Sequence, residues 1–404
     1  MHIGMILENE FMTDPRVRRE AEYLASEGYR LSVLTPDFNS SALEEKNKNI
    51  EIIRFRLRKF IFNKFRPLTP SISVYTHIWS KQLIRYLEAY KIDILHVHDL
   101  PLMKLGIEIG KKYKVPVVGD FHENYSEAIK MYYWANTLKG KLLINFKKWE
   151  NLQRYCVKNL TKIVVVADEA VAMFSEKYDR SKNDFFIVDN SIDIDQFTKS
   201  GINKTLNDKL HSIYAGKIVF GYVGAILPNR GLYHFFKILP KFKDTNIKIV
   251  IVGNGQQKKD LIAFLKSYRL EHLVDWYDWQ PFENIMTFIQ NFNVGITRLE
   301  RNLQNDATTP NKVFQYMYMK KPVLTADSLP MRRIVKETES GLVFESNNSR
   351  DLINRIEQLL ADKNLRKQLG ENGRKNVMAR YNWKVTRTQL VKLYREMGKK
   401  YYNL

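Results

Sequence analysis

Acid–base side chains gather in two short segments of the first half of the chain. Residues 95–99 read Leu-His-Val-His-Asp, and residues 119–123 read Gly-Asp-Phe-His-Glu. Each segment follows an apolar, β-branched run, so we expect it at the carboxyl end of a strand. Side chains alternate along a strand, which places His96 and His98 on one face. Neighbouring parallel strands would then bring together three histidines and three carboxylates: His96, His98, His122, Asp99, Asp120 and Glu123.

Histidine combined with carboxylate is also a ligand set for zinc. Neither a histidine pair at helical spacing nor a second cysteine accompanies the cluster, since Cys156 is the only cysteine of the chain. We therefore expect no metal site here. The plain alternative for His96 is a buried histidine that is hydrogen-bonded to nearby loops.

A second group of residues is suited to binding phosphate. Gly224 ends the apolar run Val219–Val223, and Gly253-Asn254-Gly255 ends the next run. Glycine allows a tight turn, and free N–H groups at a loop-to-helix junction bind anions. Arg230 stands just before a helical segment and would add positive charge. Alternatively, Arg230 is a surface arginine and the glycine pair is an ordinary turn.

Residues 309–317 read Thr-Pro-Asn-Lys-Val-Phe-Gln-Tyr-Met and precede the apolar Pro322–Leu324. This pattern predicts a polar loop, a short helix and a buried strand. The passage resembles the donor-sugar motif of glycosyltransferase family 4, the retaining nucleotide-sugar transferases. Asp-Pro-Arg-Val at residues 14–17, followed by Arg-Glu-Ala at residues 19–21, matches a subset of that family, and the segment ending at Glu123 is similar to its sugar-contacting segment. The resemblance covers nearly the whole chain.

The resemblance implies roles for the residues already named. His122 would reach the transferred sugar, with Glu123 and Asp99 in support. Arg230 would neutralise the donor diphosphate beside the turns at Gly224 and at Gly253, Asn254 and Gly255. Backbone groups of Trp279 and Gln280 would face the nucleotide base, although this segment reads equally well as an aromatic-rich edge strand. The acceptor side would comprise Asn9, Glu10, Asp14, Arg16 and His98.

The chain departs from the family pattern at two places. Relatives often carry an arginine directly after the first glycine, where this chain has Ala225, so another lysine or arginine would supply that charge. Relatives also carry two glutamates eight positions apart, which here fall near Ala307 and at Gln315. Gln315 would hydrogen-bond the ribose without a charge. The remaining donor contacts would come from the motif at residues 309–317 and the loop before it, with Asp306 standing in at the sugar: Asp306, Thr308, Thr309, Pro310, Asn311 and Lys312.

Strand-type and helix-type runs alternate in both halves, which predicts an α/β fold with parallel, doubly wound sheets. The expected strands are Ile3–Leu7, Arg30–Thr35, Ile92–Val97, Val115–Phe121, Ile163–Val166, Phe185–Val188, Val219–Val223, Lys248–Val252, Asn293–Thr297, Pro322–Thr325 and Gly341–Phe344. We expect two Rossmann-like domains, residues 1–195 and 196–383, facing across a cleft as in the GT-B architecture. The resemblance adds a final helix, about Trp383–Lys399, so that residues 384–404 return to the first domain.

The chain carries 65 Lys and Arg against 44 Asp and Glu among 404 residues, a net charge of +21. Two stretches, Arg54–Arg66 and Lys130–Arg154, combine basic with aromatic residues, which suits an anionic membrane surface. Alternatively, those aromatics belong to the core. Nucleic acid is disfavoured because no motif for it is present. The first residues read as a strand, no apolar run approaches a membrane span, and a single cysteine fits a reducing compartment. We therefore expect a cytoplasmic protein at the inner face of the membrane.

Together these features predict a retaining glycosyltransferase that uses a UDP- or GDP-linked sugar without metal or other cofactor. The leaving diphosphate would help to deprotonate a lipid-linked or polysaccharide acceptor. One alternative is a nucleotide-sugar 2-epimerase, which needs acid–base carboxylates and no acceptor. Another is a non-catalytic partner subunit, which the departures at Ala225 and Gln315 would permit.

Overall fold

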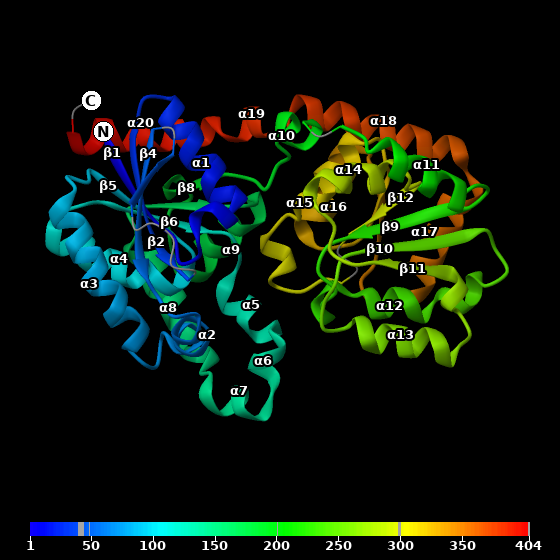
Figure 1. The fold of residues 1–404 in the computed structure, drawn as a ribbon, viewed down its shortest axis with the longest axis horizontal. Helices are drawn as coiled ribbons and strands as arrows, with labels where there is room; N and C mark the ends of the chain where they lie inside the picture. Colours follow the sequence, from blue (N-terminus) through cyan, green and yellow to red (C-terminus); the bar gives the residue numbers. More distant parts are fainter. Residues whose placement is uncertain (39–43, 48, 200, 298–299, 403–404) are drawn as a thin grey trace. The chain divides into compact units, whose positions relative to one another are not determined.

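The computed structural model describes residues 1–38, 44–47, 49–199, 201–297 and 300–402, and they form two compact units (Figure 1). Unit 1 comprises Met1–Val188 and Arg387–Leu404, and unit 2 comprises Asp189–Thr386. The division falls before the predicted boundary at residue 195. The reason is that Ile192 forms a β-bridge with Asn382 and accepts a hydrogen bond from the N–H of Trp383, which ties this segment to unit 2.

Unit 1 is built on an eight-stranded sheet in the order β3-β4-β2-β1-β5-β6-β7-β8. All neighbouring strands are parallel except β3, which runs antiparallel to β4. The strands are β1 His2–Ile6, β2 Arg30–Asp37, β3 Glu44–Asn47, β4 Ile50–Arg56, β5 Ile94–His98, β6 Val117–Phe121, β7 Lys162–Val165 and β8 Phe185–Ile187. The order reverses direction at β1, so β1 and β5 end on either side of a topological switch point.

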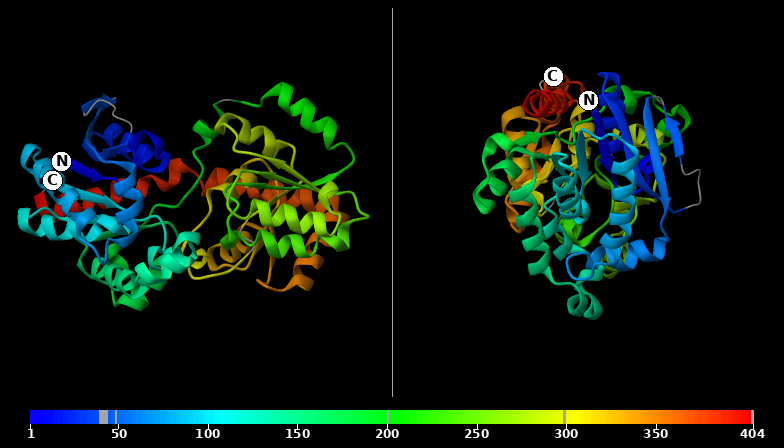
Figure 2. Two further views of the ribbon diagram at one scale, coloured as in Figure 1. Left: turned by 60° about the horizontal axis from the view of Figure 1, so that its bottom comes forward. Right: turned by 90° about the vertical axis from the view of Figure 1, so that its left-hand side faces the viewer.

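Helices cover both faces of this sheet (Figure 2). One face carries α1 Pro15–Ser26 and α20 Thr388–Tyr402, and the other carries α3 Val74–Ala89, α4 Leu100–Tyr113, α8 Phe146–Asn159 and α9 Asp168–Tyr178. Four short helices complete unit 1: α2 Lys59–Phe65, α5 Tyr125–Met131, α6 Tyr133–Asn136 and α7 Leu138–Leu143. The carboxylate of Asp14 caps α1 by accepting from the N–H groups of Arg16 and Val17.

Unit 2 has a six-stranded parallel sheet in the order β11-β10-β9-β12-β13-β14. Its strands are β9 Ile218–Val223, β10 Ile247–Val252, β11 Val274–Tyr277, β12 Val294–Ile296, β13 Val323–Ala326 and β14 Gly341–Phe344. One apolar core lies under α12 Leu232–Lys237, α13 Lys258–Ser267 and α17 Ser349–Ala361. The other lies under α10 Ile194–Thr198, α11 Lys204–Ile213, α14 Phe282–Gln290, α15 Asn311–Tyr318 and α16 Leu329–Thr338. The helices α18 Lys363–Ala379 and α19 Trp383–Thr386 follow.

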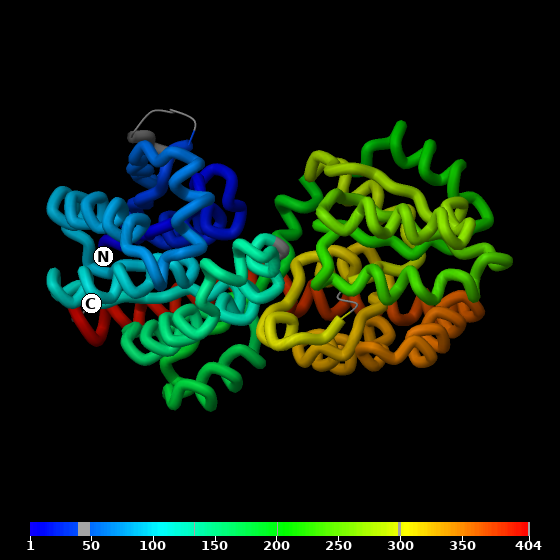
Figure 3. The backbone as a smooth tube through the Cα atoms, turned by 90° about the horizontal axis from the view of Figure 1, so that it is seen from below, coloured from blue at the N-terminus to red at the C-terminus, as the bar shows by residue number. Residues whose placement is uncertain are grey.

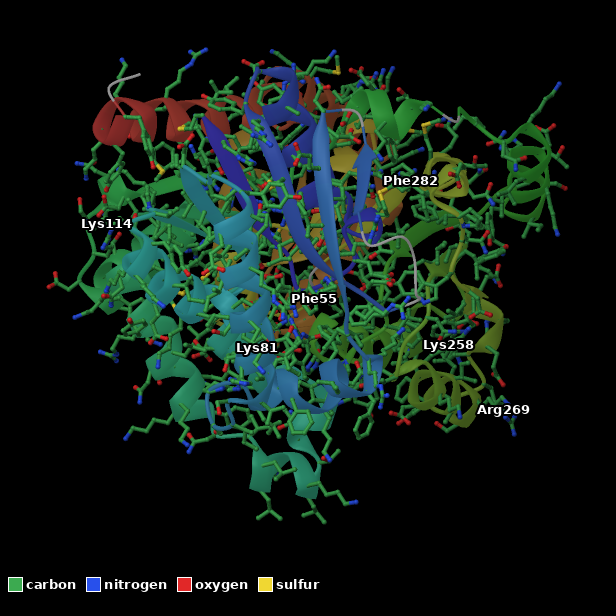
Figure 4. The ribbon with its side chains drawn as sticks, turned by 60° about the vertical axis from the view of Figure 1, so that its left-hand side comes forward. Phe55, Lys81, Lys114, Lys258, Arg269 and Phe282 are labelled. Carbon is green, nitrogen blue, oxygen red and sulfur yellow. The ribbon has the colours of Figure 1, made fainter. Side chains whose placement is uncertain are left out.

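The predicted α/β architecture with two parallel sheets is confirmed. The expected final helix is divided into α19, which stays in unit 2, and α20, which belongs to unit 1, so the chain returns at Arg387 and not at residue 384. The sequence missed β3 and β4, and part of the stretch Arg54–Arg66 is therefore strand. Phe55 of β4 is 7% exposed and packs edge-on against Trp79 (Figure 4). Trp149, in the second basic stretch, is also buried. These aromatics are core residues and were wrongly assigned to a membrane-facing surface. Among the described residues, no helix combines the length and apolar character needed to cross a bilayer.

Candidate functional site

The histidines of unit 1 meet at the carboxyl ends of β5 and β6, as the alternation predicted. These strands are parallel neighbours with His98 opposite Asp120. The rings of His96 and His98 stack with centroids 4.4 Å apart. Nδ1 of His98 lies 3.3 Å from Nε2 of His122, which itself lies 3.3 Å from Oδ2 of Asp120. The cluster is therefore a connected polar network, with His98 and Asp120 fully buried and His122 partly exposed.

His122 is held between two carboxylates. Burial lowers its pKa, but Asp99 and Asp120 outweigh burial and raise the pKa to about 10. Burial alone would raise the pKa of Asp120, whereas Arg16 and His122 together lower it well below its usual value. At neutral pH, His122 is a cation and Asp120 an anion. The imidazolium is then a hydrogen-bond donor and has no lone pair with which to act as a base.

Asp99 reaches His122 from a strained backbone. It occupies the position just before α4 with φ 62° and ψ 147°, a combination that side-chain-bearing residues seldom adopt. Such a conformation costs about 1–3 kcal/mol and concentrates at functional sites. Its Oδ1 lies 3.6 Å from Nδ1 of His122, too far for a direct hydrogen bond. This spacing leaves both groups able to contact a hydroxyl group between them.

Behind the cluster lies a largely buried ionic layer. Arg16 places Nε 3.1 Å from Glu20 and Nη2 3.4 Å from Asp120. His96 directs Nδ1 to the hydroxyl of Tyr394 in α20, at 2.6 Å. One potential metal-ligand atom from each of four residues lies within 4.8 Å of the others: Glu20, His96, His98 and Asp120. Since Arg16 contacts both carboxylates of this set, its guanidinium already supplies positive charge there.

Two further polar contacts of this region were missed by the sequence. Glu8, two residues after the end of β1, is fully buried and accepts from Nε of Arg66 at 2.8 Å and from the Tyr75 hydroxyl at 3.2 Å. Arg66 had been counted as surface charge. Glu123 accepts a hydrogen bond from the Tyr132 hydroxyl at 2.9 Å. An acid directly after a buried strand is the only local signal that pointed to Glu8.

The remaining acceptor-side residues lie at the β1–α1 connection. The backbone carbonyl of Asn9 accepts from Thr35, and the carboxylate of Glu10 accepts from the N–H of Phe38. Asp14 is occupied as the cap of α1. Arg16 is mostly buried in the ionic layer, so within this group the structure joins Arg16 and His98 to the cluster.

In unit 2, two glycine turns press against each other. Gly224 follows β9 with φ 133°, and Gly253 follows β10 with φ 145°. A Cβ on Gly253 would lie 2.1 Å from the carbonyl oxygen of Gly224, so only glycine fits there. A Cβ on Gly224 would lie 2.7 Å from Nζ of Lys312. The ammonium group of α15 therefore lies over the turn that ends at Ala225, the position where relatives carry an arginine.

The neighbouring residues complete the rim of this turn. Lys312 also lies over the Tyr222 ring, with Nζ 3.8 Å from the centroid. Arg230 ends a short 3₁₀ helix just before α12, and among the described residues it has no ion-pair partner. Asn254 donates to Asp278 at 3.0 Å and accepts from the N–H of Gly255. Lys312 thus lies over the Gly224 turn, and Arg230 follows on the same connection between β9 and α12.

The predicted base-binding segment begins at the edge strand β11, so the edge-strand alternative holds for Trp276. Trp279 follows the strand and is exposed. Gln280 donates to the backbone carbonyl of Asp278 at 3.3 Å and contacts Asn284. Both predicted residues therefore lie in the loop between β11 and α14.

The segment from residue 309 to residue 326 has the predicted order of loop, helix α15 and strand β13. Asp306 is buried and already bound, accepting from Nε of Arg301 at 3.1 Å and from the N–H of Leu329 at 2.9 Å. Thr308 donates to Gln304, whereas the buried Thr309 hydroxyl has no hydrogen-bond partner among the described residues. Pro310 precedes α15, Asn311 is its exposed first residue, and Gln315 lies half-buried one turn later.

Comparisons with known proteins support the same identification. Residues 16–196 match the family model "Glycosyltransferase Family 4", and residues 203–376 match "Glycosyl transferases group 1". The uncharacterized glycosyltransferase MJ1178 of Methanocaldococcus jannaschii is 25% identical over 339 residues, which cover 83% of each chain. The alpha-monoglucosyldiacylglycerol synthase of Acholeplasma laidlawii is 21% identical over 341 residues, covering 81% of this chain and 79% of that one.

Among solved structures, Anabaena Alr3699/HepE in complex with UDP-glucose matches with a TM-score of 0.72 at 12% identity, covering 98% of this chain and 100% of that chain. At such low identity, the match supports the fold alone. The family matches extend over both units and agree with the two parallel sheets. The chain therefore belongs to the family 4 type of GT-B glycosyltransferases.

Proposed function

We propose that this glycosyltransferase moves a sugar from a nucleotide diphosphate sugar to a lipid-linked or polysaccharide acceptor in cell-surface glycan synthesis, with retention at the anomeric carbon. The bound UDP-glucose of the Anabaena protein supports the donor class. The glycolipid-synthase name of the Acholeplasma relative supports a lipid-linked acceptor. The observation that carries the proposal is the ammonium group of Lys312 over the Gly224 turn.

Lys312 takes the place of the charge that Ala225 does not provide. A glycine turn brings backbone N–H groups close to a ligand, and a cation beside them binds a diphosphate. Lys312 supplies that cation from α15, and Arg230 supplies a second at the start of α12. Both charges act most strongly on the leaving diphosphate, because negative charge grows there as the sugar bond breaks. Gln315, without a charge, holds the ribose by hydrogen bonds.

In the transfer step, the bond between the anomeric carbon and the diphosphate oxygen breaks, and a bond from the acceptor oxygen forms on the same face. The acceptor proton passes to the departing diphosphate oxygen, so that no protein base is needed. This assignment fits His122, which is an imidazolium at neutral pH and donates to a sugar hydroxyl. Asp99, 3.6 Å away, accepts from the same hydroxyl. We propose that no metal or other cofactor takes part, since Lys312 and Arg230 supply the positive charge.

Nucleotide binding by single-residue variants tests this proposal. Lys312→Ala and Arg230→Ala are each expected to weaken UDP or GDP binding by about tenfold or more, because a charged hydrogen bond is lost. Binding of the matching nucleoside should not change, and Lys243→Ala, an exposed lysine of the same unit, should behave as the wild type. Titration calorimetry with nucleoside and nucleoside diphosphate measures both. Equal losses for the two ligands would place the diphosphate elsewhere.

Product analysis then separates the two reaction classes. Incubation with a UDP-sugar and a glycan acceptor should give UDP and a glycosylated product. Conversion of the UDP-sugar alone into its 2-epimer would identify an epimerase instead. Absence of turnover with any donor, combined with retained nucleotide binding, would identify a non-catalytic subunit.

A further inference from the structure

Helix α7 presents large apolar side chains to solvent. Leu138 is 85% exposed and Leu142 is 86% exposed, and at i and i+4 they share one face of the helix. Leu143 is also exposed. Helices α6 and α7 extend away from the sheet of unit 1 (Figure 1), and the chain from α5 to α8 forms one contiguous helical group (Figure 3). Isolated exposed apolar residues are common, whereas several on one projecting helix mark an interaction surface.

The surroundings of these leucines are uniformly basic. Residues 137–148 contain four lysines and no acid: Lys139, Lys141, Lys147 and Lys148. The neighbouring α2 adds Lys64, whose ammonium lies over the rings of Phe60 and Phe65. Phe60 itself is 66% exposed. Exposed leucine and phenylalanine within a ring of lysines are complementary to an anionic bilayer, where apolar side chains enter the interface and cations meet the headgroups.

A cavity opens beside this surface, with a volume of about 440 Å³. Its walls are mainly apolar and are formed by Phe62, Pro67, Leu68, Trp134, Leu143 and Ile144. Lys64 and Lys139 add positive charge to its lining, which also includes Arg66, paired with Glu8. The cavity thus combines an apolar interior with a basic margin, which is the chemistry of a hydrocarbon chain attached to an anionic headgroup.

Two wall residues of the cavity make contacts that lead towards the His122 cluster. Arg66 pairs with the buried Glu8 and packs against the ring of Tyr125. Trp134 stacks on Tyr132 with centroids 5.7 Å apart, and Tyr132 donates to Glu123, the neighbour of His122. A chain of side-chain contacts therefore leads from the cavity wall to Glu123, the residue that follows His122 in the sequence.

We propose that this cavity binds the hydrocarbon chain of an anionic lipid, with Leu138 and Leu142 of α7 inserted in the bilayer interface. This inference rests on the proposed function: the lipid is the acceptor, and its headgroup points past Arg66 and Tyr132 towards His122. The membrane contact is then not a general property of the basic stretches. It belongs to α7, α2 and the cavity, while Phe55 and Trp149 remain in the core.

Fluorescence quenching tests occupation of the cavity. Vesicles of phosphatidylcholine and phosphatidylglycerol with brominated acyl chains should quench the protein, because bromine quenches tryptophan only at short range. Trp134→Phe should abolish most of this quenching while vesicle binding in sedimentation is retained. Trp279→Phe, which removes an exposed tryptophan of unit 2, is the matched control and should leave the quenching intact. Unchanged quenching in Trp134→Phe would overturn the proposal.

Vesicle partitioning tests the role of α7. The double variant Leu138→Ser/Leu142→Ser should bind the anionic vesicles at least tenfold more weakly than the wild type. The control Ile213→Ser, at an exposed apolar residue of unit 2, should bind as the wild type. Equal binding by the double variant, or equal wild-type binding to purely zwitterionic vesicles, would overturn the proposal. Neither assay contains a sugar donor, so failure of the lipid proposal is distinguishable from failure of the proposed transferase reaction.

Discussion

His122 is the residue whose chemistry depends most on its neighbours. A histidine in water is largely neutral above pH 7, but the carboxylates of Asp99 and Asp120 keep this one protonated to about pH 10. The same contacts fix its position, because Asp120 is itself held by Arg16 and His98. The imidazolium is therefore both a hydrogen-bond donor for a substrate and a structural cation that neutralises the buried Asp120 and the partly exposed Asp99.

This dual role predicts a pH dependence of stability. The pKa of His122 is raised in the folded state, so its contribution is fully present below about pH 6.5 and is lost as pH rises through about 10. Each unit of pKa difference corresponds to about 1.4 kcal/mol. The melting temperature of the wild type should thus fall between pH 7 and pH 10, and that of His122→Gln should fall less. At pH 7 the variant should be less stable by roughly 3 kcal/mol, since the buried Asp120 and the partly exposed Asp99 lose a cationic partner.

Thermal unfolding monitored by circular dichroism across this pH range provides the measurement. His77→Gln, at an exposed histidine of α3, is the control and should retain the wild-type slope. Parallel curves for His122→Gln and wild type would show that the imidazole does not carry the stabilising charge.

The His122 cluster was predictable because the alternation of side chains along a strand and the end of a strand can both be read from a few neighbouring residues. His96 and His98 had to share a face, and Asp120 and His122 had to follow the neighbouring strand. The pair of Glu8 and Arg66 was not predictable in the same way, because 58 positions separate its members. Lys312 was predicted as a donor residue, but its place over Gly224 depends on how α15 packs against β9.

At the scale of elements, the two glycine turns determine how closely the carboxyl ends of β9 and β10 approach each other. The N–H of Gly224 donates to Val252, and the N–H of Gly253 donates to Tyr277, so each turn continues the ladder of its neighbour. The backbones then meet without room for a side chain. This close approach leaves the ends of both strands open to a ligand that needs backbone N–H groups.

Gly253→Ala is therefore expected to be more damaging than a typical glycine replacement. The new Cβ would lie 2.1 Å from the Gly224 carbonyl oxygen at a φ of 145°, so both turns must shift. We expect a loss of about 3 kcal/mol or more in unfolding free energy and a loss of nucleotide binding. Gly28→Ala is the matched control, because Gly28 has a positive φ but nothing within 4 Å of its Cβ position. It should cost about 1 kcal/mol.

Urea unfolding of both variants measures the difference in free energy. Similar small losses for Gly253→Ala and Gly28→Ala would mean that the contact between the two turns is not important for stability.

The regular elements were predictable wherever an apolar run ended at glycine or at a cap, as in β9, β10 and α1. Strand β4 was missed because Arg54 and Arg56 obscure its alternation, although Ile50, Ile52 and Phe55 are buried. The exposure of Leu138 and Leu142 in α7 was equally hidden, since apolar residues in a sequence are normally assigned to a core.

At the scale of the whole molecule, the two units differ in whether one continuous segment of the chain forms them. Unit 2 is one continuous segment, Asp189–Thr386, with both of its apolar cores inside that range. Unit 1 needs α20 from the far end of the chain. Helix α20 buries four large side chains in unit 1: Leu390, Leu393, Tyr394 and Met397.

Truncation after Thr386 should therefore unfold unit 1 selectively. Burial of one large apolar side chain contributes about 1.5–3 kcal/mol, so the loss of α20 removes more than roughly 5 kcal/mol, comparable to the stability of a typical domain. Residues 189–386 expressed alone should retain a cooperative transition. Scanning calorimetry of the full chain, the truncated chain and this fragment should show one transition shared by all three, and a second that only the full chain retains.

Tyr394→Phe, which removes only the hydrogen bond to His96, should reduce the unfolding free energy of unit 1 by only about 1 kcal/mol. A truncated chain that keeps both transitions would show that unit 1 is complete without α20, whereas an unfolded fragment would show that unit 2 depends on the rest of the chain.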